Sequence, residues 1–254
     1  MRIYVCVKQV PDTAANIKLV DGTGYDPQVK YVANPYDEYG VEEAVKLVEG
    51  AGEGEVVAVC LGNDGADNSL RSIMAMGAHR SILVESDAQF IDPVQTAREL
   101  AKAIKDDCGG TPDLVFTGKQ SVDSEGMQTP YWLGAELGLP VVNQISGLEI
   151  DGTTATAQRE LGSGVTETLS LSLPCVIGAT KGLNEPRYPK LPAIMKAKKK
   201  KIDRVAPAAE AFDGFELAGM EPVAERSQAR ILEGETAQVV AELVNILKTE
   251  EKVI

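Results

Sequence analysis

Residues 55–84, EVVAVCLGNDGADNSLRSIMAMGAHRSILV, decide the fold of this chain. The apolar run at residues 55–61 is typical of a buried strand. Apolar residues then recur at helical spacing from about residue 64 to 76, and Gly77 ends that helix. A second apolar run at residues 81–84 predicts another strand. A strand, a helix and a strand at this spacing predict a βαβ unit with parallel strands.

The same alternation extends to both sides of this unit. Further strands are predicted at residues 3–7 and 114–117, and further helices at residues 36–49, 93–105 and 127–137. Repeated βαβ units form a mainly parallel sheet with helices on its faces. We therefore expect an α/β fold of the Rossmann-like kind.

The pattern changes near residue 145. Short alternating runs at residues 145–150, 153–158 and 165–172 are separated by turn residues, among them Asp151-Gly152. An Asp-Gly pair between such runs is a strong hairpin signal, so we expect a β-hairpin insertion. A buried strand at residues 173–178 then returns to the sheet.

The C-terminal part of the chain has little periodicity before a final amphipathic helix at residues 235–248. We expect an α/β domain at residues 1–206 and, at residues 207–254, an extended C-terminal arm and helix that pack on a partner.

The composition excludes several classes of protein. With a net charge of −13, the chain would repel the phosphates of nucleic acid. No apolar run approaches the roughly 20 residues that span a bilayer, so we expect no membrane insertion. Met1 leads directly into a strand pattern, which predicts a cytoplasmic protein, or a mitochondrial matrix protein if the source is eukaryotic.

Cysteine and histidine usage argues against metal and nucleophile chemistry. The four cysteines lack CxxC spacing and are expected to be free thiols: Cys6, Cys60, Cys108 and Cys175. The single histidine, His79, follows a helix end and precedes a strand. We therefore expect no metal site and no Ser-His-Asp triad.

The best candidate for a ligand site is the loop after the strand at residues 114–117. Its sequence, GKQSVDSEGMQT, leads into the start of a helix. Free N–H groups at a helix N-terminus favour a phosphate, and ligands of parallel sheets bind where the strands end. The loop has no Walker A or GxGxxG motif, and the same residues also suit an ordinary helix cap.

Residues 184–201, NEPRYPKLPAIMKAKKKK, form the second candidate site. They contain seven of the 25 basic residues in an acidic chain. Pro189 and Pro192 predict a protruding, semi-rigid loop rather than a helix. Its apolar side chains would be exposed, which usually marks a contact surface, and its lysines would attract an acidic partner. A lysine run that merely solubilises a loop is the alternative.

These features together resemble the electron transfer flavoprotein β-subunit family. NEPRY and IMKAKKKK occur in this order, Gly118-Lys119-Gln120 matches the family's GKQ, and Asp123 and Gln128-Thr129 follow it. The resemblance covers essentially the whole chain and implies an adenine nucleotide-binding α/β domain.

The resemblance implies two sets of functional residues. The implied AMP-binding residues are Cys6, Asn34, Pro35, Tyr36, Asp37, Leu61, Gln120, Ser121, Val122, Asp123, Ser124, Glu125, Gly126, Met127, Gln128, Thr129, Pro130 and Tyr131. The implied partner-docking residues are Tyr188, Leu191, Pro192, Ile194, Met195, Lys196, Lys198, Lys199, Lys200 and Lys201.

The resemblance also implies a place in an electron-transfer chain. The partner would be an electron transfer flavoprotein α subunit, which would hold most of the redox-active FAD. Acyl-CoA or related dehydrogenases, as in fatty acid oxidation, would supply electrons, and a quinone oxidoreductase or another acceptor would take them. This chain would bind AMP for structure and perform no bond chemistry.

Two alternatives are open. In the electron-bifurcating branch of the family, a second FAD replaces AMP and the complex oxidises NADH. Members of that branch resemble DGDTAQVGP after the GKQ-like triplet, whereas this chain has DSEGMQTPY, which favours AMP. A stand-alone adenine-nucleotide sensor is the other alternative, but it explains neither the Leu191 loop nor the C-terminal arm.

Overall fold

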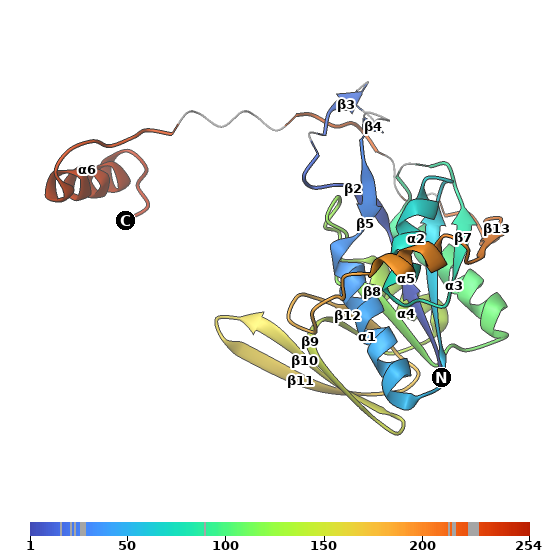
Figure 1. The fold of residues 1–254 in the computed structure, drawn as a ribbon. Coiled ribbons are helices and arrows are strands. Elements are labelled where there is room, and N and C mark those ends of the chain that lie inside the picture. The colour runs from blue at the N-terminus through green and yellow to red at the C-terminus, as the bar shows by residue number, and fades with distance from the viewer. Residues whose placement is uncertain are drawn as a thin grey trace. The chain divides into compact units, whose positions relative to one another are not determined.

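The computed structural model describes residues 1–254 apart from 16, 21, 23, 26–28, 89, 213, 215, 216 and 223–228. The chain forms two compact units, Met1–Met220 and Glu221–Ile254 (Figure 1). The first unit thus ends after Met220, whereas we expected the α/β domain to end after residue 206.

The segment after residue 206 belongs to the first unit because its backbone N–H groups form hydrogen bonds with side chains of helix α3 (Pro93–Cys108). The N–H of Ala208 donates to Glu99 Oε2 at 2.9 Å, and the N–H of Phe212 donates to Gln95 Oε1 at 2.7 Å. These bonds tie the beginning of the expected arm to the α/β domain.

A nine-stranded sheet forms the centre of the first unit, in the order β11-β10-β9-β12-β8-β1-β6-β7-β13. Its parallel part consists of β1 (Arg2–Cys6), β6 (Glu55–Gly62), β7 (Arg80–Glu85), β8 (Leu114–Gly118), β12 (Val176–Ala179) and β13 (Ile202–Val205). This confirms the predicted α/β fold with a mainly parallel sheet.

The expected hairpin region extends this same sheet. Strand β9 (Val141–Asp151) pairs parallel with β12, and β10 (Thr154–Gly162) and β11 (Val165–Ser172) continue antiparallel. Two small two-stranded sheets, which sequence periodicity did not predict, pair β2 (Gln9–Pro11) with β5 (Tyr31–Ala33) and β3 (Leu19–Val20) with β4 (Gly24–Tyr25).

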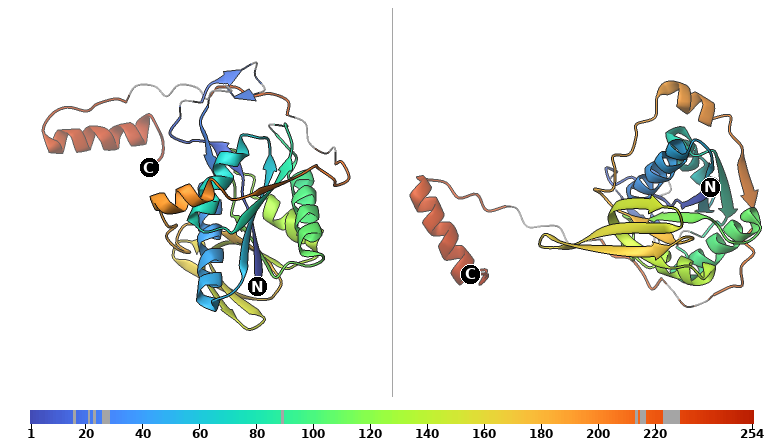
Figure 2. Two further views of the ribbon diagram at one scale, coloured as in Figure 1. Left: turned by 45° about the vertical axis from the view of Figure 1, so that its right-hand side comes forward. Right: turned by 90° about the horizontal axis from the view of Figure 1, so that it is seen from below.

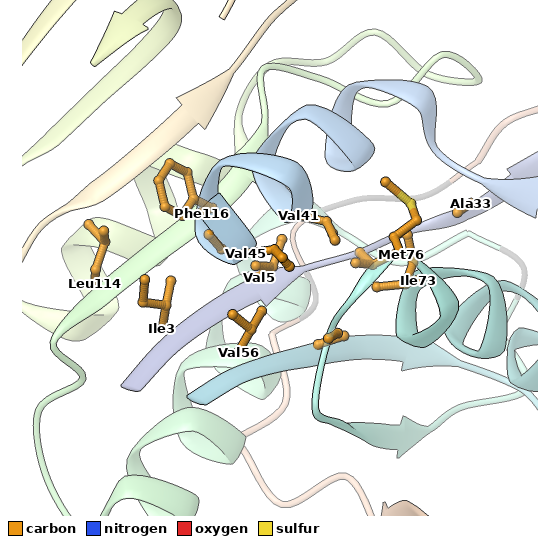
Figure 3. Packing of buried hydrophobic residues seen from close by; sticks show 14 of the residues in the cluster. Ile3, Val5, Ala33, Val41, Val45, Val56, Ile73, Met76, Leu114 and Phe116 are labelled. Atoms are coloured by element: carbon orange, nitrogen blue, oxygen red, sulfur yellow. The ribbon is translucent and has the colours of Figure 1, made fainter. Parts of the chain in front are cut away.

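Helices cover both faces of the sheet (Figure 2). Helices α1 (Pro35–Ala51) and α2 (Ala66–Met76) pack on one face, and α3 and α4 (Thr129–Leu137) pack on the other. Successive strand residues point to opposite faces, so Ile3 and Val5 join the first core cluster while Tyr4 joins the second. Figure 3 shows the first cluster.

Local backbone signals set the helix ends. Helix α3 begins at the Asp92 cap, whose side chain accepts the N–H of Val94 at 2.6 Å. Helix α4 begins at Thr129 rather than at residue 127, because Met127 has a left-handed φ of 55° that no helix accommodates.

The expected loop at residues 184–201 contains a helix, α5 (Leu191–Ala197). The expectation that its prolines prevent a helix was therefore wrong. Pro192 lies in the first turn, where the N–H that proline lacks would have no helical partner. Proline here starts the helix instead of breaking it.

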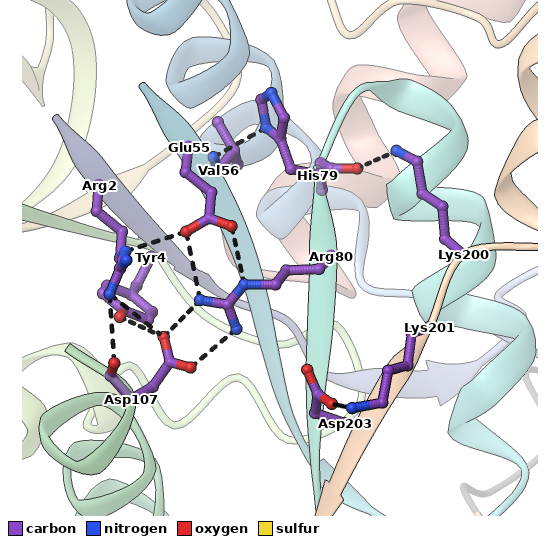
Figure 4. Close-up of polar contacts among 11 residues, drawn as sticks. Arg2, Tyr4, Glu55, Val56, His79, Arg80, Asp107, Lys200, Lys201 and Asp203 are labelled. Carbon is purple, nitrogen blue, oxygen red and sulfur yellow. Dashed lines mark hydrogen bonds and ion pairs between the residues drawn. The ribbon is translucent and has the colours of Figure 1, made fainter. Parts of the chain in front are cut away.

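A network of ion pairs joins the amino-terminal ends of the strands (Figure 4). Arg80 binds Glu55 at 2.9 Å and Asp107 at 2.6 Å, and the hydroxyl of Tyr4 donates to Asp107 at 2.6 Å. Because residues of β1, β7 and α3 all take part in the network, it stabilises the packing of these elements at this edge of the sheet.

The second unit contains helix α6 (Thr236–Thr249), preceded by a segment that Arg230 ties to it through Glu242 and Glu250. None of the residues of α6 is buried, although its sequence is amphipathic. Its apolar side chains Val240, Leu243 and Val244 are exposed.

Candidate functional site

A single buried carboxylate organises the carboxyl edge of the parallel sheet. Asp37, only 5% exposed, lies in the first turn of α1. It accepts the N–H of Lys8 at 2.7 Å, the N–H of Gly118 at 2.9 Å and the side-chain amide of Asn34 at 2.8 Å. Asp37 therefore connects α1 with the chain after β1 and at the end of β8.

Burial raises the pKa of Asp37 to about 7, and the three N–H donors act in the opposite direction. The close approach requires a glycine at position 118, since a Cβ there would overlap Asp37 Oδ1 and lie 2.7 Å from Tyr36 Cβ. The Asp37 carboxylate can therefore take this position only because residue 118 is a glycine.

Asn34 and Lys8 hold the loop that follows β8. The amide of Asn34 donates to the carbonyl of Gln120 at 2.9 Å, and its Oδ1 accepts the N–H of Val122 at 3.2 Å. Lys8 Nζ pairs with Asp123 at 2.8 Å and with Ser121 Oγ at 3.4 Å. The first half of the loop is therefore fixed by side chains from outside it.

The second half of the loop is exposed and strained. Glu125 and Met127 both have left-handed φ angles, 52° and 55°, which cost a non-glycine residue about 1–2 kcal/mol each. Backbone strain of this kind gathers at ligand-binding segments. The loop leads straight into α4, where Pro130 has no N–H and the N–H groups of Tyr131 and Trp132 donate to the carbonyl of Gln128, so an anion would bind chiefly to N–H groups of the loop.

The structure brings most of the predicted nucleotide residues together. The segment Asn34 to Asp37 contacts the loop from Gln120 onward through the bonds above. Cys6 ends β1 and Leu61 lies near the end of β6, both on the sheet face that carries α3 and α4. Sequence reasoning missed Lys8, although its place directly after a strand was a usable signal.

The partner-docking segment presents an apolar surface. Tyr188 is 93% exposed and Leu191 is 71% exposed, and Ile194 and Met195 are exposed beside them. Exposed apolar side chains grouped on one short segment are a mark of a contact site.

Ion pairs anchor the start of this segment to α1. The guanidinium of Arg187 binds Glu42 at 2.8 Å and Glu49 at 2.7 Å. The amide of Asn184 donates to Glu43 at 2.9 Å and to the carbonyl of Tyr39 at 3.0 Å. The NEPRY motif therefore fixes the position from which α5 starts.

Helix α2 holds the other end of α5. Arg71 donates to the carbonyls of Ala197, Lys198 and Lys200 at 3.0–3.3 Å. The Lys200 ammonium in turn donates to the carbonyls of Met74 and Ala78, where α2 ends. Figure 4 shows Lys200 and one of its bonds. Burial, followed by the nearby Lys196 charge, lowers the pKa of Lys200.

The basic run is thus divided between the half-buried Lys200 and the other lysines, Lys201 included, which are exposed. That these lysines face a partner stays a prediction. Lys200 points inward, because the last carbonyls of α2 need donors. Lys201 pairs with Asp203 in β13. Lys196, Lys198 and Lys199 are exposed next to the apolar surface.

The histidine and the four cysteines lie apart from the candidate site or in structural surroundings. His79 lies at the amino edge of the sheet, where its Nδ1 accepts the N–H of Val56 at 3.0 Å, so it stands apart from the serines of the loop. All four cysteines are free, and burial raises the pKa of Cys60 to about 12. In the described ranges, no cluster of three or more His, Cys, Asp or Glu suits a metal ion, and no helix is long and apolar enough to cross a membrane.

Comparison with known proteins shows the family of the chain. Residues 24–210 match the family model of the electron transfer flavoprotein domain. The electron transfer flavoprotein subunit beta of Bacillus subtilis is 35% identical over 262 aligned residues, which cover 100% of both chains. The subunits beta of Syntrophomonas wolfei and of Homo sapiens are 42% and 41% identical, each over 82% of this chain and over 81% and 82% of their own. The chain belongs to the electron transfer flavoprotein β-subunit family.

Proposed function

We propose that this chain pairs with an electron transfer flavoprotein α subunit, binds AMP structurally and docks the dehydrogenases that supply electrons. The FAD that carries the electrons is held mainly by the α subunit, and a quinone oxidoreductase or another acceptor receives them. Acyl-CoA and related dehydrogenases are the proposed donors, as in fatty acid oxidation. The chain itself makes and breaks no covalent bonds.

The network around Asp37 is the observation that carries the nucleotide proposal. It gathers the predicted residues at the carboxyl edge of the sheet and holds a strained, exposed loop in front of α4. These residues fit AMP: the loop supplies N–H groups for one phosphate, and Lys8, which is paired with Asp123, places a cation beside the loop. AMP adds no chemistry of its own, and its binding stabilises the folded chain.

Replacing Gly126 with valine is expected to lower the AMP content of the purified protein. No protein atom lies within 4 Å of a Cβ built at Gly126, so the variant should fold normally. Two methyl groups would instead stand where a nucleotide approaches the backbone. Chromatography of the nucleotide released from denatured protein measures the content.

The same chromatography separates the two branches of the family. FAD in place of AMP, at two flavins per heterodimer, would support the electron-bifurcating alternative. Gly110→Val is a useful control, since Gly110 also has open space around it and no left-handed φ but lies between α3 and β8. Equal AMP content in Gly126→Val and wild type would remove the loop from the site.

The exposed side chains of α5 carry the docking proposal. Leu191 projects from a helix that is held at both ends, so little freedom is lost when a partner covers it. The exposed lysines beside it would act over a longer range and speed the approach of an acidic partner.

Leu191→Ala is expected to raise the apparent KM for the dehydrogenase at every ionic strength. Truncation of a buried anchor commonly costs about 2 kcal/mol, which is roughly a thirtyfold loss of affinity. Neutralising Lys198 and Lys199 should slow association mainly at low salt, because about 0.1 M salt screens charges beyond roughly 10 Å. Electron-transfer assays across a salt series measure both effects.

Lys200→Met provides the matched control for the variant in which Lys198 and Lys199 are neutralised. It also removes one positive charge from the run, but the charge is turned toward α2. The association rate of Lys200→Met with the dehydrogenase should therefore depend on salt much as that of wild type does. Wild-type kinetics of Leu191→Ala at all salt concentrations would take α5 out of the docking surface.

A further inference from the structure

The hydroxyl of Thr117 is buried without a hydrogen-bond partner among the residues that the structure describes. Thr117 lies in β8 directly before Gly118 and is 4% exposed. Few buried polar atoms in folded proteins lack a partner, because leaving one unpaired is costly. The position of this hydroxyl beside the candidate nucleotide site suggests what its partner is.

The sheet register shows which way Thr117 points. Tyr4 of β1 lies opposite Val115 of β8, and both belong to the core cluster beneath α3 and α4. Side chains two positions apart in a strand share a face, so Thr117 points to the same side as Val115. Cys6, two residues after Tyr4, points there as well and lies in the same cluster.

The loop and α4 follow Thr117 along the chain, on the same face of the sheet. The chain enters α4 from the loop after β8, and Leu133, one turn into the helix, already packs in the cluster with Val115. On the other side of Thr117, its partner in the register is Gly178 of β12, which has no side chain. The hydroxyl is therefore flanked by a thiol on one strand and, on the next, by Gly178, over which the buried carboxamide of Asn143 lies. That carboxamide donates to the carbonyl of Lys119 and accepts the N–H of Gln144.

We propose that Thr117 Oγ1 hydrogen-bonds the nucleoside part of the bound AMP. This inference rests on the proposed function. The proposed phosphate position lies at the loop, whereas Thr117 is buried on the sheet. Its surroundings include Cys6, and Val59 and Leu61 of β6 lie on the same face. Apart from the uncharged Asn143 carboxamide, these surroundings are apolar, which suits a base or a ribose and disfavours a charged phosphate.

Thr117→Val tests the inference because it removes the hydroxyl and keeps the shape of the side chain. The heterodimer, stripped of nucleotide, is titrated with AMP by calorimetry. Trp132, the single tryptophan of the chain, lies in the first turns of α4 and provides a fluorescence signal for the same titration. We expect the Kd for AMP to rise about fivefold, the effect of one lost hydrogen bond.

Three controls accompany this variant. Thr117→Ser keeps a hydroxyl and should retain most of the affinity. Ser81→Ala also removes a buried hydroxyl that has no partner in the described part of the chain, but Ser81 lies near the start of β7, so AMP binding should not change. Inorganic phosphate, used as a competitor, should bind Thr117→Val and wild type equally.

Several outcomes would overturn the inference. An unchanged Kd for AMP in Thr117→Val would show that the nucleotide does not use the hydroxyl. Weakened binding of inorganic phosphate would place the hydroxyl at the phosphate instead. A lower melting temperature of nucleotide-free Thr117→Val would point to a partner within the protein. A wild-type heterodimer that neither carries nor binds AMP would contradict the proposed function itself.

Discussion

Cutting the chain after Met220 is expected to abolish its association with the α subunit and to leave the first unit folded. The removed residues contain α6, an amphipathic helix with no buried residue. A 14-residue helix is marginally stable alone in water, so α6 needs a surface that covers Val240, Leu243 and Val244. We propose that the α subunit supplies that surface.

Co-purification followed by native mass spectrometry measures the association, and circular dichroism measures the fold. A point variant refines the test: Leu243→Asp places a charge among the apolar residues, whereas Asn245→Asp places the same charge elsewhere on the helix. Only the first should weaken the complex. Full-strength association of the truncated chain would show that the second unit is dispensable.

The position of the cut matters. A cut after Ala206 would also remove Ala208 and Phe212, whose N–H groups donate to Glu99 and Gln95 in α3. Glu99 is buried and would lose the N–H donors of Ala208 and Ala209, keeping that of the Gln95 amide, which destabilises the first unit. The shorter chain would therefore confuse loss of pairing with loss of folding.

Asp37→Ala is expected to lower the free energy of unfolding by about 3 kcal/mol or more and to empty the nucleotide site. The N–H groups of Lys8 and Gly118 and the amide of Asn34 would all lose their acceptor, and each buried donor left unpaired costs about 1–3 kcal/mol. Chemical denaturation gives the stability, and the nucleotide released from the protein gives the occupancy. Wild-type values for both would refute the organising role of this carboxylate.

Asp37→Asn isolates the charge. The folded-state pKa of about 7 lies above the ordinary value of 3.8, so the folded chain holds the proton more tightly than the unfolded chain does. The stability that Asp37 contributes should therefore be highest below about pH 4 and fall as the pH rises to about 7. Asparagine does not titrate, so this fall should be absent from the variant. An identical pH dependence in both proteins would mean that the proton is not held there.

Local patterns predicted the parts of the fold that local physics determines. The βαβ repeats followed from apolar runs, helical spacing and terminal glycines such as Gly77. Helix α5 was missed because Pro189 and Pro192 were treated only as helix breakers. Proline at the first turn is equally a start signal, and the sequence alone does not decide between the two.

The candidate site was predictable in its location and not in its connections. That the loop after β8 lies at a strand end follows from the parallel order. The bond from Gly118 to Asp37 spans 81 positions, and no short-range pattern reveals it. Lys200 likewise resembled its neighbours in sequence, and only the carbonyls at the end of α2, more than 120 positions away, distinguish it.

Helix α1 sets the distance between the proposed nucleotide site and the proposed docking segment. Asp37, in its first turn, lies at the proposed nucleotide site, and Glu49, in its last turn, pairs with Arg187, which positions the proposed docking segment. At 1.5 Å per residue, the twelve steps between them span about 18 Å. A change of ligand at the proposed nucleotide site would therefore leave the position of the proposed docking segment unchanged.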